Sequence, residues 1–398
     1  MLQTLQAPEQ TMATQRGIAW HVITCEYPPQ SGGVSDYTYL LAQGMASRGD
    51  EVHVWCPAAP EKAPETCGVE VHANLGKFSV NDLRAAGRQL DRFPSPRRLL
   101  VQWVPHGFGY KSLNLPFCLW LWHRSAHCGD RVELMVHEPY LSFLKGHWRQ
   151  NVAASVHRLM TLVVLRAAQR VWVSTPAWEE LLRPFDGGRH HTFHWLPVPS
   201  NVPTVDDAAG VAAIRRQYAA SGQLVGHFGT FGQPITPMLR AIIPPLLQRA
   251  SSASLLLIGL GSTAFREYLI RECPDLANRV HATGRIDAQD CLSLHLSACD
   301  LLVQPFPDGV TTRRSTIMAA LSHGRPTIST AGVLTEPFWR TSGAVALVPA
   351  GDSGALVESA IRFLDSPEER ASQGEAGREL YRRHFDIEHV VGLLRGLD

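Results

Sequence analysis

The sequence lacks an excess of charge of either sign, and it lacks long apolar runs. Its 398 residues carry 37 Lys and Arg against 36 Asp and Glu, so no global field attracts a polyanion and no nucleic-acid partner is expected. No run reaches the roughly 20 apolar residues that span a bilayer, and the first residues lack the apolar stretch of a signal peptide. We therefore expect a cytoplasmic protein.

Closely spaced cysteines are also missing. The eight cysteines are scattered without any C-x-x-C pair, and several lie in apolar runs, which indicates reduced, buried thiols and excludes a disulfide framework. A histidine-rich run (His190, His191 and His194) has no accompanying cysteine or carboxylate pattern. We therefore predict no metal site.

Short β-branched runs do alternate with longer amphipathic segments along the whole chain, as in repeated βα units around parallel sheets. Strands are predicted at 18–24, 51–56, 69–73, 98–103, 132–137, 170–175, 223–229, 254–259, 279–284, 300–306, 325–330 and 344–349. Helices are predicted at 35–48, 79–90, 113–126, 145–168 and 176–184, and over the last thirty or so residues with breaks near Gly374 and Asp386.

Three prolines in the segment HWLPVPSNVP (194–203) rule out a helix or a central strand there. This predicts an N-terminal Rossmann-like domain at 1–198, a second at 199–380, and a C-terminal helix at 381–398 that packs back toward the first. Two such domains face each other across a cleft lined by the carboxyl ends of both sheets, so site residues are expected directly after strands.

The first such segment is CEYPPQSGGVSDY, in which Gly32 and Gly33 precede a helix that starts at Ser35. Glycines let a ligand approach the backbone, and a helix N-terminus favours an anion such as phosphate. The alternative is an ordinary βα turn with a Ser or Asp cap. The residues by themselves leave both interpretations open.

Beyond these local patterns, YPPQSGGVSDYTYLLAQGMASRGDEVHVWCP resembles the opening of glycosyltransferase family four. MVHEPY, AQRVWVSTPAWEELL, GHFGTFG, LLLIGLGS and AALSHGRPTISTAG resemble later segments of that family in the same order. The resemblance covers nearly the whole chain. It implies the GT-B fold, in which two Rossmann-like α/β domains with parallel sheets face across a cleft.

The resemblance also implies a set of site residues. In the family the paired glycines face the donor phosphates and the reacting sugar, a strand-end histidine approaches the sugar, and a Gly-x-Ile stretch reads the base. Asp308 resembles the glutamate of the family's E-G. The implied catalytic residues are His137, Gly33 and Asp308, and the implied nucleotide-binding residues are Gly32, Gly33, Gly229, Thr230, Gly284, Arg285 and Ile286.

The sequence departs from the family at the phosphate and ribose positions. GHFGTFGQPITPM lacks the usual Arg and Lys, and Ala319 stands where the second of two glutamates is expected. Glu336 is the nearest match to another family glutamate. A replacement is offered by Arg313, Arg314, Ser315 and Thr316, because forked cationic donors and a helix N-terminus together suit a diphosphate.

The N-terminal half is predicted to hold the acceptor through Asp36, Gln102, His106 and Glu138, with Glu26 and Lys111 as further candidates. The aromatic stretch after Gln102 has a second interpretation, in which it only packs a helix onto the sheet. The stretch 143–160 mixes Lys and Arg with apolar residues as a membrane-surface helix does, so peripheral association with the inner face of a membrane is left open.

The resemblance implies sugar transfer from a nucleotide-diphosphate sugar to a glycan, lipid-linked or small-molecule acceptor, as in polysaccharide biosynthesis, with retention and without a metal or other cofactor. Two rival hypotheses remain, and the departures favour the first of them. One is a catalytically silent GT-B protein that binds a sugar or a partner glycosyltransferase. The other is a nucleotide-sugar epimerase or hydrolase.

Overall fold

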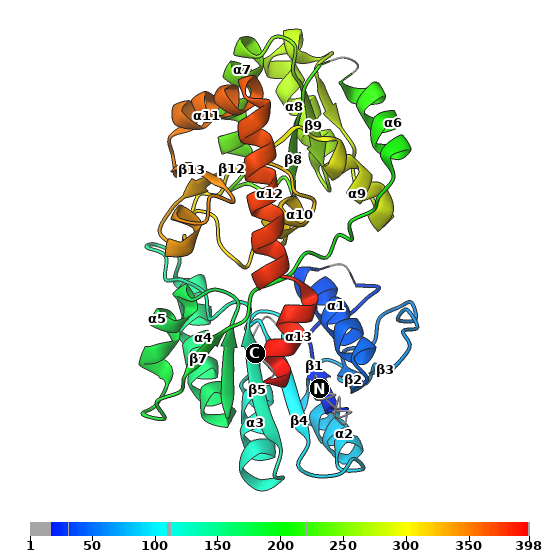
Figure 1. Cartoon of the computed structure of the whole chain (residues 1–398). Helices are drawn as coiled ribbons and strands as arrows, with labels where there is room; N and C mark the ends of the chain where they lie inside the picture. The colour runs from blue at the N-terminus through cyan, green and yellow to red at the C-terminus, as the bar shows by residue number, and fades with distance from the viewer. Residues whose placement is uncertain (1–16, 31, 110–112, 220–221, 397–398) are drawn as a thin grey trace, which may run out of the picture.

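Two parallel sheets form the centres of two α/β domains, one below the other in Figure 1. The computed structural model describes residues 17–30, 32–109, 113–219 and 222–396. Lys111 lies outside these residues. The first sheet has the strand order β3-β2-β1-β4-β5-β6-β7, and the second has the order β10-β9-β8-β11-β12-β13.

The strands of the first sheet are β1 (Ala19–Ile23), β2 (Glu51–Trp55), β3 (Val69–His72), β4 (Arg98–Trp103), β5 (Arg131–Val136), β6 (Arg170–Val173) and β7 (Phe193–Trp195). Those of the second are β8 (Leu224–Phe228), β9 (Ser254–Ile258), β10 (Val280–Ala282), β11 (Leu301–Gln304), β12 (Thr327–Ala331) and β13 (Ala346–Pro349). All strand pairs within both sheets are parallel.

Helices cover both faces of each sheet. The first domain contains α1 (Gly33–Ser47), α2 (Val80–Leu90), α3 (Leu115–His127), α4 (Trp148–Ala167) and α5 (Ala177–Leu182). The second contains α6 (Ala208–Tyr218), α7 (Thr236–Arg249), α8 (Ser262–Glu272), α9 (Gln289–Ala298), α10 (Ser315–Ser322) and α11 (Ser353–Asp365). The chain ends in α12 (Pro367–His384) and α13 (Ile387–Arg395).

The apolar pattern of β1 shows why both faces need cover. Trp20 and Val22 pack into a cluster that includes residues of α1, whereas Ile23 packs into a second cluster that includes residues of α2, α3 and α4. Because successive side chains of a strand point to opposite faces, a strand that is apolar on both faces must lie between two layers of helices.

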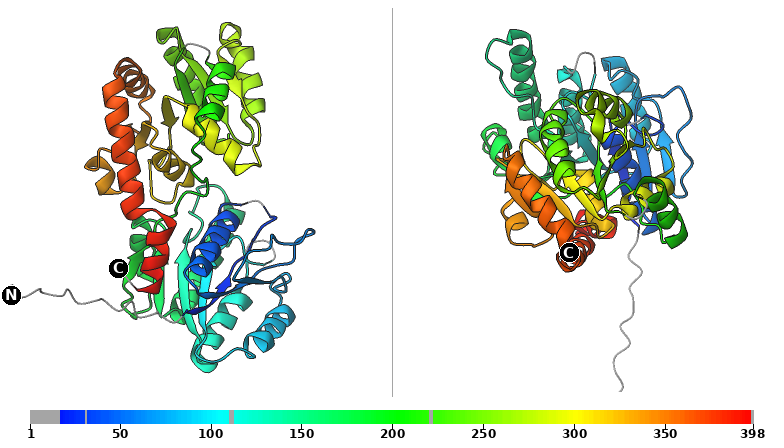
Figure 2. Two further views of the ribbon diagram at one scale, coloured as in Figure 1. Left: turned by 45° about the vertical axis from the view of Figure 1, so that its right-hand side comes forward. Right: turned by 90° about the horizontal axis from the view of Figure 1, so that it is seen from above.

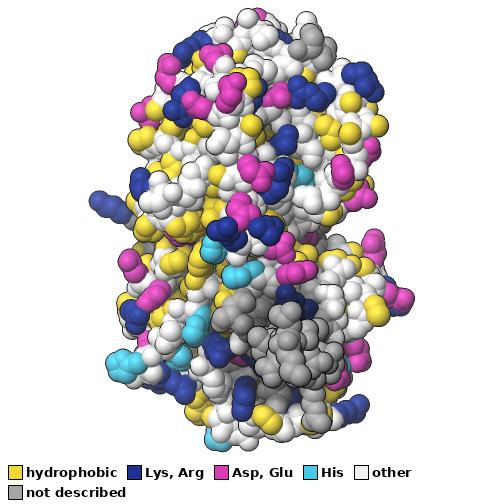
Figure 3. Space-filling view, viewed as in Figure 1, with side chains coloured by type: hydrophobic (Ala, Val, Ile, Leu, Met, Phe, Trp, Pro, Cys, Tyr) yellow, Lys and Arg dark blue, Asp and Glu magenta, His cyan; other side chains and the backbone are white. Residues whose placement is uncertain are grey.

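The two C-terminal helices connect the domains (Figures 1 and 2). Helix α12 runs along the second domain, and the Tyr381 hydroxyl accepts a hydrogen bond from the backbone N–H of Ser200 between the sheets. Helix α13 packs on the first domain, where Val390, Val391 and Leu394 share one apolar cluster with α1. On the face shown in Figure 3, basic, acidic and histidine side chains gather between the domains.

The expected architecture is confirmed, and the differences are local. The short strand β7 extends the first sheet by one strand beyond the strand ranges predicted from the sequence. The break expected at Gly374 is wrong, because α12 continues through it. A Cβ at Gly374 would collide with the Gly324 carbonyl oxygen, so this glycine serves the close approach of two backbone segments instead of ending the helix.

The eight cysteines are free thiols, and Cys67 is exposed, which differs from the expectation that the cysteines are buried. No helix in the described part of the chain has the length and apolar character needed to cross a membrane.

Candidate functional site

A cavity of about 610 Å³ lies between the domains, at the carboxyl ends of strands from the second sheet. The first domain contributes Gly32, Gly33 and Asp36 from the start of α1, and the segment between the sheets contributes Asn201. Most of the remaining lining belongs to loops after β8, β9, β10 and β11 and to the start of α10. The position fits the rule that ligands of α/β folds bind outside the carboxyl ends of the strands.

The N-terminus of α10 opens into this cavity. Arg313, Arg314, Ser315 and Thr316 all line it, and within the described chain no side chain caps this helix end. Uncapped N–H groups at a helix start attract anions, and two arginines beside them add permanent positive charge. The predicted replacement for the missing cations thus lies on one wall of the cavity.

Asp308 pairs with both arginines. Its carboxylate accepts hydrogen bonds from Nη2 of Arg313 at 2.8 Å and from Nη2 of Arg314 at 2.6 and 2.8 Å. Burial and the neighbouring Arg313 lower the pKa of the Arg314 guanidinium, although it stays charged. The Nε atoms of both arginines are buried without a partner among the described residues. Asp308, predicted to be catalytic, therefore holds the arginines, and it does not line the cavity.

Two buried polar side chains line the cavity without being satisfied by the described residues. Gln304, at the end of β11, has no solvent exposure, and neither its amide oxygen nor its amide nitrogen has a partner. His227 on β8 donates from Nδ1 to the Val303 carbonyl oxygen at 2.8 Å, while its Nε2 is unpartnered. Burial lowers the pKa of His227 to about 4, so at neutral pH Nε2 is an acceptor.

The N-terminus of α1 is closed, in contrast to that of α10. Oε1 of Glu26 accepts hydrogen bonds from the backbone N–H groups of Val34 and Ser35, at 3.1 and 3.0 Å. A Cβ at Gly32 would collide with that carboxylate, so the glycine is needed for the approach of Glu26. The protein's own carboxylate thus already accepts two N–H groups of this helix start, which the resemblance had implied for a phosphate, although Gly32 and Gly33 themselves line the cavity.

The histidine predicted to approach the sugar lies outside the cavity lining. His137, just after β5, donates from Nε2 to Oε1 of Gln102 at 2.8 Å, and its ring packs against that of Tyr37 at an interplanar angle of 78°. Burial lowers the pKa of His137 to about 3, so it is a neutral imidazole at physiological pH. Gln102 is fully buried, and its amide nitrogen has no partner among the described residues.

Of the other predicted acceptor residues, His106 and Glu138 do not line the cavity, whereas Asp36 does. Nδ1 of His106 is 3.5 Å from a Glu138 oxygen, with both side chains about half exposed, and the Glu138 charge acts on Arg314 of the opposite domain. Asp36 does line the cavity. It accepts a hydrogen bond from Nδ2 of Asn201 at 2.9 Å, and burial raises its pKa.

The stretch predicted to contact the nucleotide base, residues 284–286, forms one side of the cavity. Arg285 and Ile286 line it, and Arg285 pairs with Asp287 at 2.5 Å. Gly284 has a φ of +69° and donates its N–H to the Ser262 hydroxyl at 2.9 Å, so it shapes the turn without lining the cavity. Of the pair after β8, both Gly229 and Thr230 line the cavity.

Glu336 and Ala319 are placed away from the cavity. Oε1 of the buried Glu336 accepts hydrogen bonds from the hydroxyl groups of Thr175 and Thr312, which belong to different domains. Ala319 on α10 is fully buried in an apolar cluster with Leu256 and Leu302. Glu336 therefore joins the domains, and the Ala319 position is a core position in this chain.

Comparison with known proteins gives the family. A model described as "Glycosyl transferase 4-like domain" matches residues 32–199, and one described as "Glycosyl transferases group 1" matches residues 222–366. Together these matches cover most of the chain. This protein is a family-four, group 1 glycosyltransferase.

Relatives of this glycosyltransferase are distant. It is 23% identical over 369 residues to a phosphatidyl-myo-inositol mannosyltransferase of Mycobacterium leprae, covering 89% of both chains. Sucrose-phosphate synthase from Thermosynechococcus elongatus has a TM-score of 0.72 at 18% identity, covering 96% of this chain and 98% of the other. The Anabaena protein HepE in complex with UDP and glucose has a TM-score of 0.68 at 15% identity, covering 94% and 98%. These structures share the GT-B fold.

Sequence reasoning missed several residues of the glycosyltransferase cavity. His227, Gln304, Phe306 and Gly259 line it, yet none was selected from the sequence. A positional signal existed, because all four lie within the last three residues of a predicted strand. Their residue types gave no warning, since a single Gln or His in an apolar strand is more often a satisfied structural residue.

Proposed function

We propose that this glycosyltransferase takes a sugar from a nucleotide-diphosphate donor that binds mainly to the second domain. The observation that carries the proposal is the combination found in one cavity. An uncapped helix N-terminus, two arginines and two unsatisfied buried polar side chains all line the same 610 Å³ space. Buried polar atoms are costly unless a partner completes them, so this set is expected to be completed by a polar, anionic ligand.

The diphosphate is expected at the start of α10. Arg313 and Arg314 offer forked donors, and Ser315 and Thr316 offer hydroxyl and backbone N–H groups from the same helix end. Two adjacent guanidinium groups held by the single carboxylate of Asp308 leave net positive charge. That positive charge would neutralise a bound diphosphate and stabilise it as the leaving group when the bond between the anomeric carbon and the diphosphate oxygen breaks.

The sugar or ribose hydroxyl groups are expected at His227 and Gln304. A neutral imidazole Nε2 accepts from a hydroxyl, and a carboxamide donates and accepts at once, which matches neighbouring hydroxyl groups. A structural neighbour, HepE, binds UDP-glucose, and this supports a donor of that general class. The rival hypothesis of a catalytically silent GT-B protein that binds a sugar or a partner glycosyltransferase has no comparable observation in its favour.

Transfer is proposed to proceed with retention and without an obligatory metal. Among the described lining residues the carboxylates are Asp36 and Asp287, which already bond Asn201 and Arg285. This favours attack by the acceptor on the face from which the diphosphate leaves, with Arg313 and Arg314 supplying the cationic charge. Activity should therefore persist in EDTA, and the anomeric configuration of the product, measured by NMR, should match that of the donor.

For the acceptor we propose a lipid-linked molecule. In the loop after β5 and the first turns of α4, Phe143, Leu144, Trp148 and Val152 expose between 44% and 69% of their surface. Apolar side chains near cationic ones suit a membrane surface, and the M. leprae relative is named for a phosphatidylinositol acceptor. Wild-type protein should co-sediment with anionic lipid vesicles, and Trp148→Ser should reduce the bound fraction several-fold. Equal binding by both would remove this surface from the proposal.

Thermal denaturation with a panel of nucleotides and nucleotide sugars tests the donor proposal. The panel contains UDP, GDP, ADP, dTDP and their common sugar conjugates. We expect at least one of them to raise the melting temperature, because a ligand at about 100 times its Kd adds about 2.7 kcal/mol to the free energy of unfolding. Release of the nucleoside diphosphate only when an acceptor extract is added would establish transfer. Release without any acceptor would favour hydrolysis instead.

A further inference from the structure

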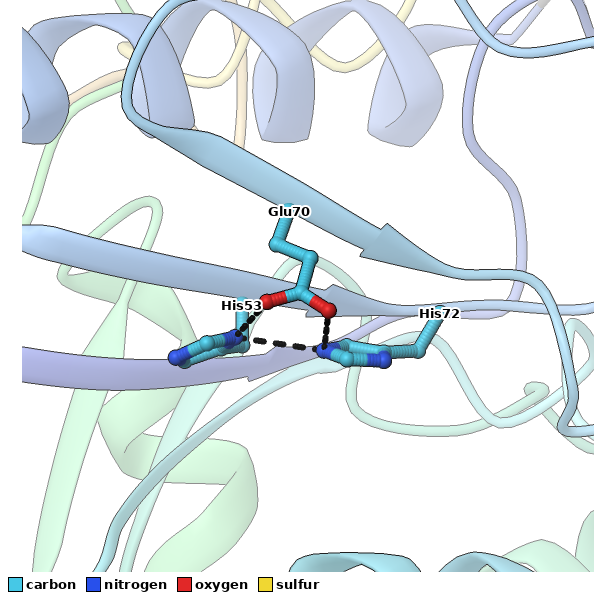
Figure 4. A group of neighbouring side chains, drawn as sticks. All are labelled: His53, Glu70 and His72. Atoms are coloured by element: carbon cyan, nitrogen blue, oxygen red, sulfur yellow. Dashed lines mark hydrogen bonds and ion pairs between the residues drawn. The ribbon is translucent and has the colours of Figure 1, made fainter. Parts of the chain in front are cut away.

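A group of two imidazoles and one carboxylate lies on the first sheet, away from the cavity (Figure 4). His53 is on β2, and Glu70 and His72 are on the edge strand β3. The parallel register places His53 opposite Glu70, and Trp55 opposite His72. None of these residues lines the cavity between the domains. The sheet therefore brings together three potential metal ligands that are far from any motif of the transfer site.

The ligand atoms converge at distances that suit a bound ion. Nδ1 of His53 lies 3.2 Å from Nε2 of His72 and 3.3 Å from Oε2 of Glu70, while the Nε2 of His72 lies 3.7 Å from Oε1 of Glu70. Metal–ligand bonds of 2.0–2.1 Å at tetrahedral angles place ligand atoms about 3.3–3.4 Å apart. The distance between the two imidazole nitrogens and that from His53 to Oε2 of Glu70 are thus close to edges of a zinc coordination tetrahedron, and one Glu70 oxygen would have to serve both nitrogens when an ion binds.

A second carboxylate orients the central imidazole. Nε2 of His53 donates to Oε1 of Glu51 at 2.9 Å. A neutral histidine has one ring proton, so this bond leaves the lone pair of Nδ1 directed at the Glu70 carboxylate and at His72. Metal-bound histidines characteristically give their other N–H to a carboxylate in this way. The Nε2 of His72 can satisfy this lone pair by donating a hydrogen bond, and a cation at the centre of the three groups would satisfy it equally while making both imidazoles its ligands.

Aromatic side chains enclose the two imidazoles of this group, and the Glu70 side is open to solvent. The His53 side chain is 4% exposed and the His72 side chain is 15% exposed, whereas Glu70 is 65% exposed. Trp55 stacks on His72 with ring centroids 4.1 Å apart, and Phe93 packs on His53 at 4.5 Å. Aromatic walls fix the imidazole planes, and the solvent side next to Glu70 leaves room for a water as a fourth ligand.

We propose that His53, His72 and Glu70 bind one Zn²⁺ ion, with Glu51 holding His53 in the correct tautomer. Two imidazole nitrogens and one carboxylate oxygen form a donor set that zinc prefers over Mg²⁺ or Ca²⁺. The ion joins β2 to the edge strand β3. It therefore stabilises the exposed edge of the sheet, independently of donor binding.

The proposal departs from the sequence prediction of no metal site, which considered the run at 190–194. In that run the His191 imidazole already pairs with Asp186 and with the Ala168 carbonyl oxygen. The three proposed ligands are separated in sequence by up to 19 residues. Only the pairing of β2 with β3 brings them together, so no spacing motif marks the site.

Titration calorimetry of the full chain tests the site, after treatment with a chelator that is then removed by dialysis. ZnCl₂ should bind wild-type protein at one tight site, while MgCl₂ should not. Glu70→Gln, at an exposed position, and His72→Ala should each abolish the tight site. Glu51→Gln should weaken it about ten- to hundredfold, because Glu51 only orients a ligand. His281→Ala in the second domain is the matched control and should bind as wild type does.

The chain contains 18 histidines, and others among them can also bind Zn²⁺. The proposal is therefore judged by the difference in Zn²⁺ binding between wild type and the variants. Equal Zn²⁺ binding by wild type, Glu70→Gln and His72→Ala would overturn the proposal, as would the absence of a tight site in wild type. A rise in the wild-type melting temperature with Zn²⁺ that Glu70→Gln lacks would support the stabilisation of the sheet edge.

Discussion

Two buried polar regions of the second domain differ in how completely the protein satisfies them. Around Glu336, one oxygen accepts from the Thr312 N–H and from the hydroxyls of Thr175 and Thr312, while the other accepts from Trp339 Nε1. Around the cavity, Gln304 and His227 retain unpartnered atoms among the described residues. A completed network holds a structure together, whereas an incomplete one in a cavity indicates where a ligand binds.

The same contrast separates two helix ends. Glu26 completes the start of α1, while the start of α10 faces the cavity beside Arg313 and Arg314 without a side-chain cap in the described chain. Both helices begin at the cleft, so position alone would favour either as the phosphate site. The two helix starts differ because the Glu26 carboxylate is already bound at α1, whereas no carboxylate accepts the first N–H groups of α10 among the described residues.

Removing Glu336, the acceptor at the centre of the completed network, should have the largest effect on the free energy of unfolding. Glu336→Ala leaves Thr175, Thr312 and Trp339 without their acceptor, so we expect a loss of about 3 kcal/mol in the free energy of unfolding. Denaturant unfolding monitored by fluorescence measures it. Glu336→Gln keeps an acceptor oxygen and should lose less. A Glu336→Ala protein as stable as wild type would show that the network does not join the domains.

Opening the start of α1 should cost less. Gly32→Ala places a methyl group where the Glu26 carboxylate lies, so Glu26 must release the Val34 and Ser35 N–H groups at a cost of about 1–2 kcal/mol. Gly33→Ala is the control, since a Cβ there would meet nothing within 4 Å. If the two variants unfolded at the same denaturant concentration, the role given to Glu26 would be wrong.

The buried His227 predicts a pH dependence of stability. Its pKa is about 4 in the folded protein and about 6.5 when unfolded. The unfolded state therefore binds the proton first as pH falls, and stability is lost between pH 6.5 and 4, at up to about 1.4 kcal/mol per pH unit. His227→Gln should show a shallower loss than wild type between pH 6.5 and 5. Identical slopes would contradict the burial of a neutral imidazole.

The smallest expected change in the free energy of unfolding is a gain, in contrast to the losses above. Gln304→Leu removes an unsatisfied buried amide, so the ligand-free protein should gain about 1 kcal/mol in the free energy of unfolding while donor binding weakens. Gln373→Leu is the matched control, because Oε1 of the buried Gln373 accepts from the Thr327 N–H at 2.8 Å, and its loss should destabilise. Destabilisation by both variants would mean that Gln304 has a structural role.

The layer architecture could be predicted because it depends on local patterns. Apolar strands and amphipathic helices alternate regularly, and the glycine- and proline-rich loops after strands fall where the βα rule expects them. The continuation of α12 through Gly374 could not, because it depends on contact with Gly324 on another element. Propensity describes a residue's neighbours in sequence and not those in space.

The candidate site was likewise predictable only where it depends on local sequence patterns. Arg313 and Arg314 were identified by their charge after a strand, and they line the cavity. The pairing of Glu26 with α1, and of Asp308 with both arginines, depends on side-chain geometry that no spacing encodes. His227 and Gln304 were missed because their significance lies in hydrogen bonds they do not make. Such an absence becomes visible only in three dimensions.

Titration calorimetry of nucleoside diphosphates against wild type and Arg314→Gln tests the central claim most directly. Arg362→Gln is the control, since Arg362 is an exposed arginine of α11 that pairs with Glu369. We predict that one nucleoside diphosphate binds wild type and Arg362→Gln equally, and binds Arg314→Gln about ten- to hundredfold more weakly. Unchanged affinity in Arg314→Gln would contradict the assignment of the diphosphate to the start of α10.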